Sequence, residues 1–177
     1  NLLTLHGLYY STYGSWWEWA PPDNHFRMPY WAHMGEFLHT VERMSYLLSQ
    51  GVYRADVAVI YPVAAVEAGR GGKESVDTAF AAGKSLYGQG IDFDFMDFES
   101  LARARVEDRK LKVAGEEYRV LVLPAMRALR HSTLVKAVEF QRGGGIVAML
   151  GEAPMASERT GEGDAEVLAL AAELKQS

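Results

Sequence analysis

The chain has 177 residues, of which 49% are apolar and 23% charged, with a formal net charge of -5. These proportions are typical of a globular protein, and the lack of any run of about 18 apolar residues argues against a membrane protein. The basic residues are scattered, which argues against a nucleic-acid partner. With no cysteine in the sequence, a disulfide framework, a thiolate nucleophile and a cysteine zinc site are excluded.

Residues 1–6 (NLLTLH) form a short apolar run, which predicts a strand buried on both faces. Because the chain opens on this run without a methionine or a signal pattern, we expect it to be a piece of a longer protein. Apolar residues recur every three or four positions over 33–50 and predict an amphipathic helix that ends at Gly51. The strand, the loop and this helix form one βα unit, in which ligands bind at the loop that follows the strand.

The loop over residues 6–31 contains all four tryptophans of the protein and four of its nine tyrosines. Sugars present apolar C–H faces and a ring of hydroxyls, so a sugar site combines flat aromatic rings with a few polar groups. We interpret the segment as a carbohydrate-binding loop; the alternative is that these rings form a minor core. The aromatic candidates are Tyr9, Tyr10, Trp16, Trp17, Trp19 and Trp31, and the polar candidates are His6, Glu18, His25 and Arg27.

Glu18 is the candidate catalytic residue of this loop, because it lies between Trp17 and Trp19. Burial between two indole rings would raise its pKa, as the general acid of glycoside cleavage requires. The alternative is an exposed loop carboxylate. Glycoside hydrolysis also needs a second carboxylate about 5 to 10 Å away, and Asp23 is the only other candidate nearby.

The second half of the chain alternates between buried strands and amphipathic helices. Strands are predicted at 57–61, 91–95, 118–123 and 146–150. One helix is predicted after the first strand, and two further helices, at 132–142 and 165–175, follow the third and fourth strands. This alternation implies right-handed crossovers and an α/β fold, an open and mostly parallel sheet with helices on both faces in a flavodoxin-like arrangement. The contrast with the aromatic first part predicts two domains, 1–52 and 53–177.

Several shorter features complete this prediction. Residues 63–73 are predicted as a loop, and the helix that follows is expected to bury Val76, Ala79, Phe80, Gly83, Leu86 and Tyr87.

The glycine-rich stretch 69–75 lies where a phosphate loop would be, but Glu74 occupies the position that needs Ser or Thr, so a flexible surface loop is favoured. Asp97 and Asp164 are expected to cap helices, and residues 109–118 to form a hairpin. No histidine spacing indicates a metal site.

The first part of the chain resembles the end of the catalytic barrel in glycoside hydrolases such as family 106, the α-L-rhamnosidases. The resemblance rests on His6-Gly7, Tyr9-Tyr10, the Trp-rich stretch, Arg27 before Pro29-Tyr30-Trp31, Glu42-Arg43, Gly51 and the run from Asp56 to Pro62. Residues 94–98, 111–115, 118–124 and 143–154 resemble the class I glutamine amidotransferase-like α/β domain that follows the barrel in those enzymes and in family 42 β-galactosidases.

This resemblance implies that residues 1–52 are the last βα unit of a (β/α)8 barrel, with His6, Tyr10, Trp17 and Arg27 lining the substrate pocket. The catalytic carboxylates would lie mostly on earlier strands, so the chain alone is expected to be inactive. The substrate would be a glycoside from plant or microbial polysaccharide, in the periplasm or outside the cell, with no cofactor.

The resemblance also implies a role for residues 53–177, which we expect to be incomplete at the C-terminal end. Without a cysteine nucleophile, an amidotransferase-like domain would serve as a scaffold or as a subunit contact in a homo-oligomer. The competing interpretation is a non-catalytic α/β assembly module whose aromatic loop is an interface patch, since Trp, Tyr and Arg dominate protein interfaces. A nucleotide-binding flavodoxin-like protein is disfavoured by the failed phosphate loop.

Overall fold

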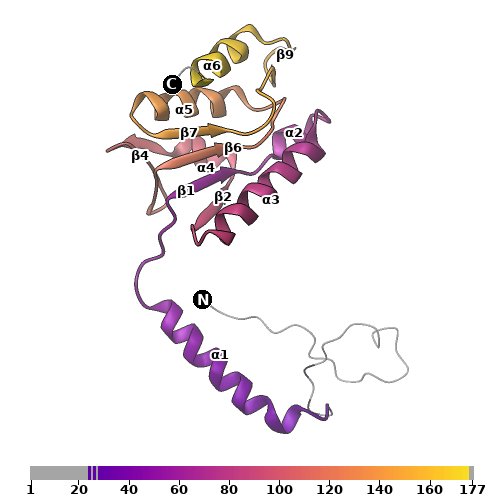
Figure 1. Cartoon of the computed structure of the whole chain (residues 1–177), viewed down its shortest axis with the longest axis vertical. Coiled ribbons are helices and arrows are strands. Elements are labelled where there is room, and N and C mark those ends of the chain that lie inside the picture. Colours follow the sequence, from indigo (N-terminus) through magenta and orange to yellow (C-terminus); the bar gives the residue numbers. More distant parts are fainter. Residues whose placement is uncertain (1–23, 25, 27, 176–177) are drawn as a thin grey trace, which may run out of the picture. The chain divides into compact units, whose positions relative to one another are not determined.

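The computed structural model describes residues 24, 26 and 28–175, which form two compact units, one up to Tyr53 and one from Arg54 onward (Figure 1). The strand predicted at 1–6 lies outside the described residues. Among the described residues, no helix has both the length and the apolar character needed to cross a membrane.

The described part of the first unit is a single long helix. A short 3-10 helix η2 (Trp31–His33) leads into α1 (Met34–Ser49), and Gly51 follows with a left-handed φ of 89°. The helix predicted at 33–50 is therefore confirmed. No residue of α1 is buried. Its apolar stripe is between 44% and 58% exposed at Phe37, Leu38, Met44 and Leu48.

The second unit is built on a four-stranded parallel sheet. Its strands are β1 (Val57–Ile60), β2 (Phe93–Met96), β6 (Val120–Leu123) and β7 (Ile146–Met149), in the order β2-β1-β6-β7. The open parallel sheet expected from the sequence is confirmed. The chain moves outward from β1 to β2 and then crosses back to β6, so the order reverses between β1 and β6.

Helices cover both faces of this sheet, as Figure 1 shows for α3 (Gly72–Gly88) and α5 (His131–Arg142). In β1, Val57 and Val59 pack with Ala79 of α3, whereas Ala58 and Ile60 belong to the larger core of α5. This core also includes residues of α4 (Phe98–Arg103) and α6 (Ala165–Lys175), whose predicted caps Asp97 and Asp164 are confirmed. The two central strands, β1 and β6, are buried on both faces, which explains their continuous apolar runs in the sequence.

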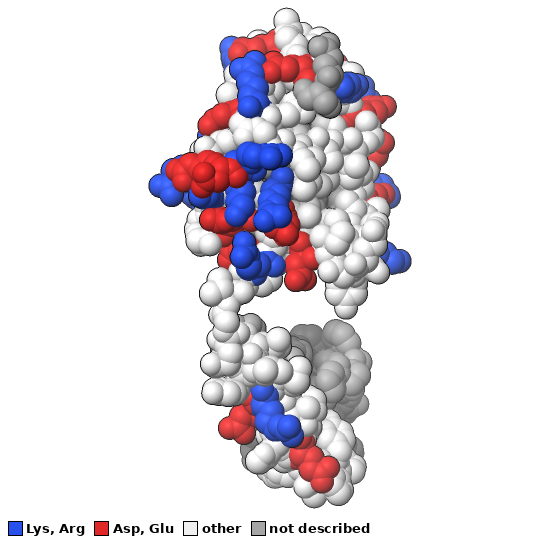
Figure 2. Space-filling model, turned by 60° about the vertical axis from the view of Figure 1, so that its left-hand side comes forward, with Lys and Arg blue, Asp and Glu red and all other residues white. Residues whose placement is uncertain are grey.

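Two small sheets lie beside the main one. The predicted hairpin is confirmed as β4 (Lys110–Val113) and β5 (Glu116–Tyr118), and β3 (Arg105–Glu107) adds a third strand; β8 (Ala156–Ser157) and β9 (Gly161–Glu162) form a second hairpin. The lysines of β4 are paired with acidic groups, Lys110 with Glu117 at 2.5 Å and Lys112 with Asp108 at 2.8 Å. Figure 2 accordingly shows Lys and Arg beside Asp and Glu, not a continuous basic surface.

The prediction of a loop over 63–73 is wrong. Residues after Pro62 form the helix α2 (Val63–Glu67), because the run VAAVE has no helix-breaking residue and the Val66 N–H donates to the Pro62 carbonyl at 3.3 Å. Gly69 and Gly71 then take left-handed φ values of 62° and 68°. The chain can therefore turn sharply into α3, which begins within the predicted loop.

The predicted buried face of α3 is partly wrong, because Phe80 and Tyr87 are 53% and 81% exposed. The buried residues of the helix are the small ones, Ser75, Ala79 and Gly83. A Cβ at Gly83 would lie 2.7 Å from the Phe93 ring of β2. Close approach of the helix to the sheet therefore sets its orientation, and Phe80 and Tyr87 remain outside.

Candidate functional site

Of the predicted site residues, the structure describes only Trp31. It begins η2, donates its backbone N–H to the Met28 carbonyl at 3.0 Å, and is 42% exposed. The others stay predictions, because they lie outside the described residues: Glu18, His6, Tyr9, Tyr10, Trp16, Trp17, Trp19, His25 and Arg27.

The glycine-rich stretch 69–75 does not form a phosphate site. Its two cations are already paired, Arg70 with Glu162 at 2.5 Å and Lys73 with Asp77. Glu74 lies in the first turn of α3, where its charge would repel a phosphate. Residues 72–75 are helical, so the expectation of a flexible loop holds at most for residues 69–71. Among the described residues there is also no group of three or more potential metal ligands.

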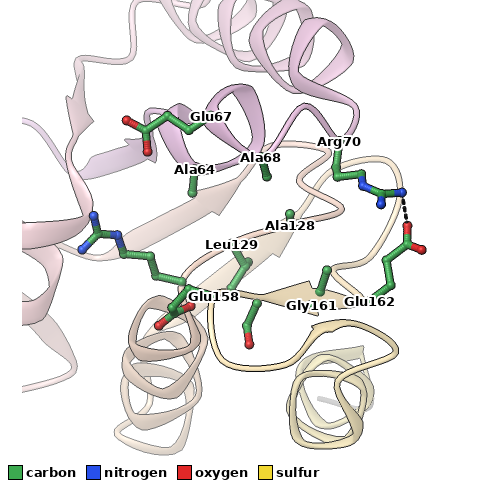
Figure 3. Close-up of a pocket in the computed structure, with 12 residues that line it drawn as sticks. Ala64, Glu67, Ala68, Arg70, Ala128, Leu129, Glu158, Gly161 and Glu162 are labelled. Carbon is green, nitrogen blue, oxygen red and sulfur yellow. Dashed lines mark hydrogen bonds and ion pairs between the residues drawn. The ribbon is translucent and has the colours of Figure 1, made fainter.

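A pocket of about 650 Å³ lies in the second unit, at the carboxyl ends of the parallel strands (Figure 3). We call it the switch-point pocket. Its walls come from α2, which follows β1, from residues 128–130 after β6, and from the β8–β9 hairpin after β7. In open α/β sheets, ligands bind where the strand order reverses, at the carboxyl ends of the strands. The pocket therefore occupies the position where this type of sheet binds ligands.

The lining combines a floor of small apolar residues with charged groups at the rim. Figure 3 shows a dashed line from Arg70 to Glu162 at one end, whereas Glu67 lies toward the other end. Glu158 accepts a hydrogen bond from the backbone N–H of His131 at 2.9 Å, and the Arg130 guanidinium lies 3.5 Å from the centre of the Phe98 ring. The floor consists of Ala64, Ala68, Ala128, Leu129, Ala156 and Gly161.

The β8–β9 wall of the pocket is held by Asp164. The Ser157 hydroxyl donates to one carboxylate oxygen of Asp164, and the other oxygen accepts from the backbone N–H groups of Glu166 and Val167 at 3.0 and 3.2 Å. These bonds, the Ser157 bond first, lower the pKa of Asp164 to about 2. One carboxylate thus caps α6 and fixes the hairpin.

Asp164→Asn is expected to lower the unfolding temperature at neutral pH, with a difference that disappears in acid. The folded pKa of about 2 lies below the ordinary value of 3.8, so the carboxylate contributes stability that is fully present above about pH 5 and is lost as the pH falls toward 2. Thermal unfolding followed by circular dichroism from pH 2 to pH 7 measures this difference. Asp77→Asn, at an exposed carboxylate of α3, is the control. A difference independent of pH would contradict the prediction.

The family model of glycoside hydrolase family 106, alpha-L-rhamnosidase, matches residues 22–177. The chain is thus of the glycoside hydrolase class. It belongs to family 106, the alpha-L-rhamnosidases, which confirms the resemblance found in the sequence. No curated protein matches the chain.

A solved structure similar to the chain is that of a beta-galactosidase from Bifidobacterium adolescentis. The two share 19% sequence identity, the similarity covers 67% of this chain and 53% of that one, and the TM-score is 0.48. The chain thus spans about half the length of the beta-galactosidase chain that it matches.

The sequence contains a partial signal for the switch-point pocket. Pro62 and Pro124 lie within two residues of the ends of two buried strands, β1 and β6. The carboxyl ends of parallel strands meet at one edge of a sheet. The loops after β1 and β6 could therefore have been placed together. The third wall could not, because the β8–β9 hairpin folds back through long-range backbone bonds, such as Leu129 N–H to the Ala156 carbonyl at 3.2 Å.

Proposed function

We propose that the chain is part of a longer glycosidase. Residues 1–52 would close a (β/α)8 catalytic barrel, and residues 53–177 would form a flavodoxin-like accessory domain of the class I glutamine amidotransferase type. The observation that carries this proposal is the family match over residues 22–177. The strand order β2-β1-β6-β7 supports the second assignment, because it corresponds to the first four positions of the flavodoxin-like order.

The exposed stripe of α1 supports the barrel assignment. A helix with one apolar face requires a partner that covers this face. The described residues bury no part of α1, and Phe37 and Leu48 are 46% and 58% exposed. The outer helices of a (β/α)8 barrel pack this face against the strands, which would account for the stripe.

In this proposal the aromatic loop binds the substrate, a glycoside derived from plant or microbial polysaccharide. Trp31 and the tryptophans before it would stack on the sugar ring, and Arg27 would donate hydrogen bonds to its hydroxyls. Hydrolysis proceeds between two carboxyl groups, one of which protonates the leaving oxygen. Glu18 is one candidate for the acid, and the remaining candidates would lie on earlier barrel strands.

Trp31→Ala in the full-length protein is expected to reduce kcat/KM for an aryl α-L-rhamnoside by about 2- to 10-fold, the loss of one ring contact. Arg27→Ala is expected to have at least the same effect, because it removes charge-assisted hydrogen bonds. Initial rates measure the change in kcat/KM. Tryptophan fluorescence during titration with rhamnose and with galactose measures sugar binding. Tyr87→Ala, at an 81% exposed ring of α3, is the control. Unchanged rates in both variants and no fluorescence response from the folded wild type would refute the proposal.

The alternative is a non-catalytic assembly module, and an aromatic cluster on the second unit favours it. The Phe95 ring of the edge strand β2 lies 5.4 Å from the Phe80 ring and 5.9 Å from the Tyr61 ring, centre to centre. All three side chains are at least 40% exposed. Exposed aromatic residues beside an edge strand suit a contact between two copies of the chain. Light scattering that gives a monomeric mass for the full-length protein would exclude this contact.

A further inference from the structure

We propose that the switch-point pocket binds a neutral sugar ring. The pocket volume of about 650 Å³ lies within the range of about 300 to 1,000 Å³ that small-molecule sites occupy. The proposed function places no ligand in this pocket, because its substrate contacts lie in the aromatic loop. The choice of a sugar over other small polar molecules rests on the proposed function.

The charges of the lining disfavour an ionic ligand. Three carboxylates (Glu67, Glu158 and Glu162) and two guanidinium groups (Arg70 and Arg130) surround the pocket. The lining has a formal net charge of -1 on this count, so a phosphate or a sugar acid is repelled. A metal cation lacks a set of ligands there, because the described residues contain no group of three or more potential metal ligands. A neutral ligand that both donates and accepts hydrogen bonds satisfies both kinds of group.

The polar groups are placed at separate ends of an apolar floor. Within the described part of the chain, Glu67 makes no hydrogen bond or ion pair, so both its oxygens can accept from hydroxyls. At the other end, the Arg70–Glu162 pair offers further donors and acceptors, and its side chains are 56% and 53% exposed. Such an exposed pair contributes little to stability, so it can rearrange around a ligand. Between these ends, Ala64, Ala128 and their neighbours offer apolar side chains to C–H groups.

The scaffold of the pocket is preorganised. Arg70 lies between Gly69 and Gly71, both with left-handed φ, and its N–H donates to the Ala65 carbonyl at 3.2 Å. A Cβ at Gly72 would lie 2.8 Å from the Val66 backbone, so the α2–α3 turn is tightly packed. On the opposite wall, Asp164 holds Ser157. Binding therefore does not require these walls to be ordered first.

Titration of the isotope-labelled 177-residue chain with L-rhamnose, followed by amide chemical shifts, tests this proposal. Saturable shifts are expected at residues 64–70, 128–130 and 156–162. Glu67→Gln is expected to raise the Kd obtained from these shifts about tenfold, because it replaces one acceptor oxygen by an amide donor and removes the charge from the other. Glu99→Gln, an exposed glutamate on α4 outside the lining, is expected to leave them unchanged.

The remaining outcomes separate this inference from the proposed function. No shifts in the three pocket segments, or shifts that are equal in Glu67→Gln, would overturn it, even if the aromatic loop responds to the sugar. Shifts produced by alanine, a zwitterion, in place of rhamnose would also overturn it. Pocket shifts with rhamnose in the 177-residue chain, together with no glycosidase activity in the full-length protein, would refute the proposed function and leave the pocket assignment standing.

Discussion

Phe140→Ala is expected to destabilise the second unit by about 3 to 5 kcal/mol. Phe140 lies on α5 with no exposed surface, and it belongs to the core cluster that includes Leu101 of α4 and Leu121 of β6. Truncation removes the ring from this contact between helices and sheet and leaves a cavity that the neighbours cannot fill completely. Urea denaturation of the 177-residue chain, followed by circular dichroism, measures the loss.

The control for this substitution is Tyr87→Ala, another aromatic residue on a helix of the same unit. Tyr87 is 81% exposed, and its truncation is expected to change the free energy of unfolding by no more than about 0.5 kcal/mol. Similar losses in both variants would show that α5 does not pack on the sheet as described.

The centre of the parallel sheet could be predicted from the sequence because its two central strands, β1 and β6, are buried on both sides. In β1, alternate residues face opposite helices, Val59 toward α3 and Ile60 toward α5. Both kinds of position therefore require apolar side chains, and the run is continuous. Prolines and glycines around these runs then separated strands from helices, so the alternation of elements was readable without knowledge of tertiary contacts.

The orientation of α3 could be predicted only in part, because apolar periodicity places the large residues Phe80 and Tyr87 on the same face as Ala79 and Gly83. In the structure Ala79 and Gly83 face the sheet, and Phe80 remains exposed beside Phe95. The ring of Phe93 fills the space that a larger residue at position 83 would need. That fit between a strand residue and a helix residue depends on the strand pairing, which the sequence pattern does not contain.

The two candidate sites, the aromatic loop and the switch-point pocket, also differ in how far the sequence predicts them. The aromatic loop can be recognised because its residues lie close together in the sequence, and its role in substrate binding stays a prediction, also for Trp31. The switch-point pocket is assembled from Glu67, Arg130 and Glu158, which lie on three separate segments. Their association follows from the reversal of strand order between β1 and β6 and from the return of the β8–β9 hairpin.

Gly145→Ala is expected to destabilise the second unit by about 1 to 3 kcal/mol or more, through overpacking. Gly145 follows α5, and a Cβ built there would lie 2.0 Å from the Phe140 ring. Because Phe140 is completely buried, its ring has no free space to enter. Urea denaturation measures the change. Gly88→Ala, with nothing within 4 Å of the added carbon, is the control and is expected to be nearly neutral.

A second substitution identifies the clash as the cause. Phe140→Ala removes all the ring atoms that the added methyl group would meet within 2.4 Å, so Gly145→Ala is expected to cost less in this background than in the wild type. The coupling between the two positions is expected to be about 0.5 to 3 kcal/mol, the range for residues in contact. Losses of unfolding free energy that simply add for the two substitutions would contradict the clash. Coupling would show that the α5 ring and the turn before β7 fit each other, and therefore that the position of β7 depends on the residue at 140.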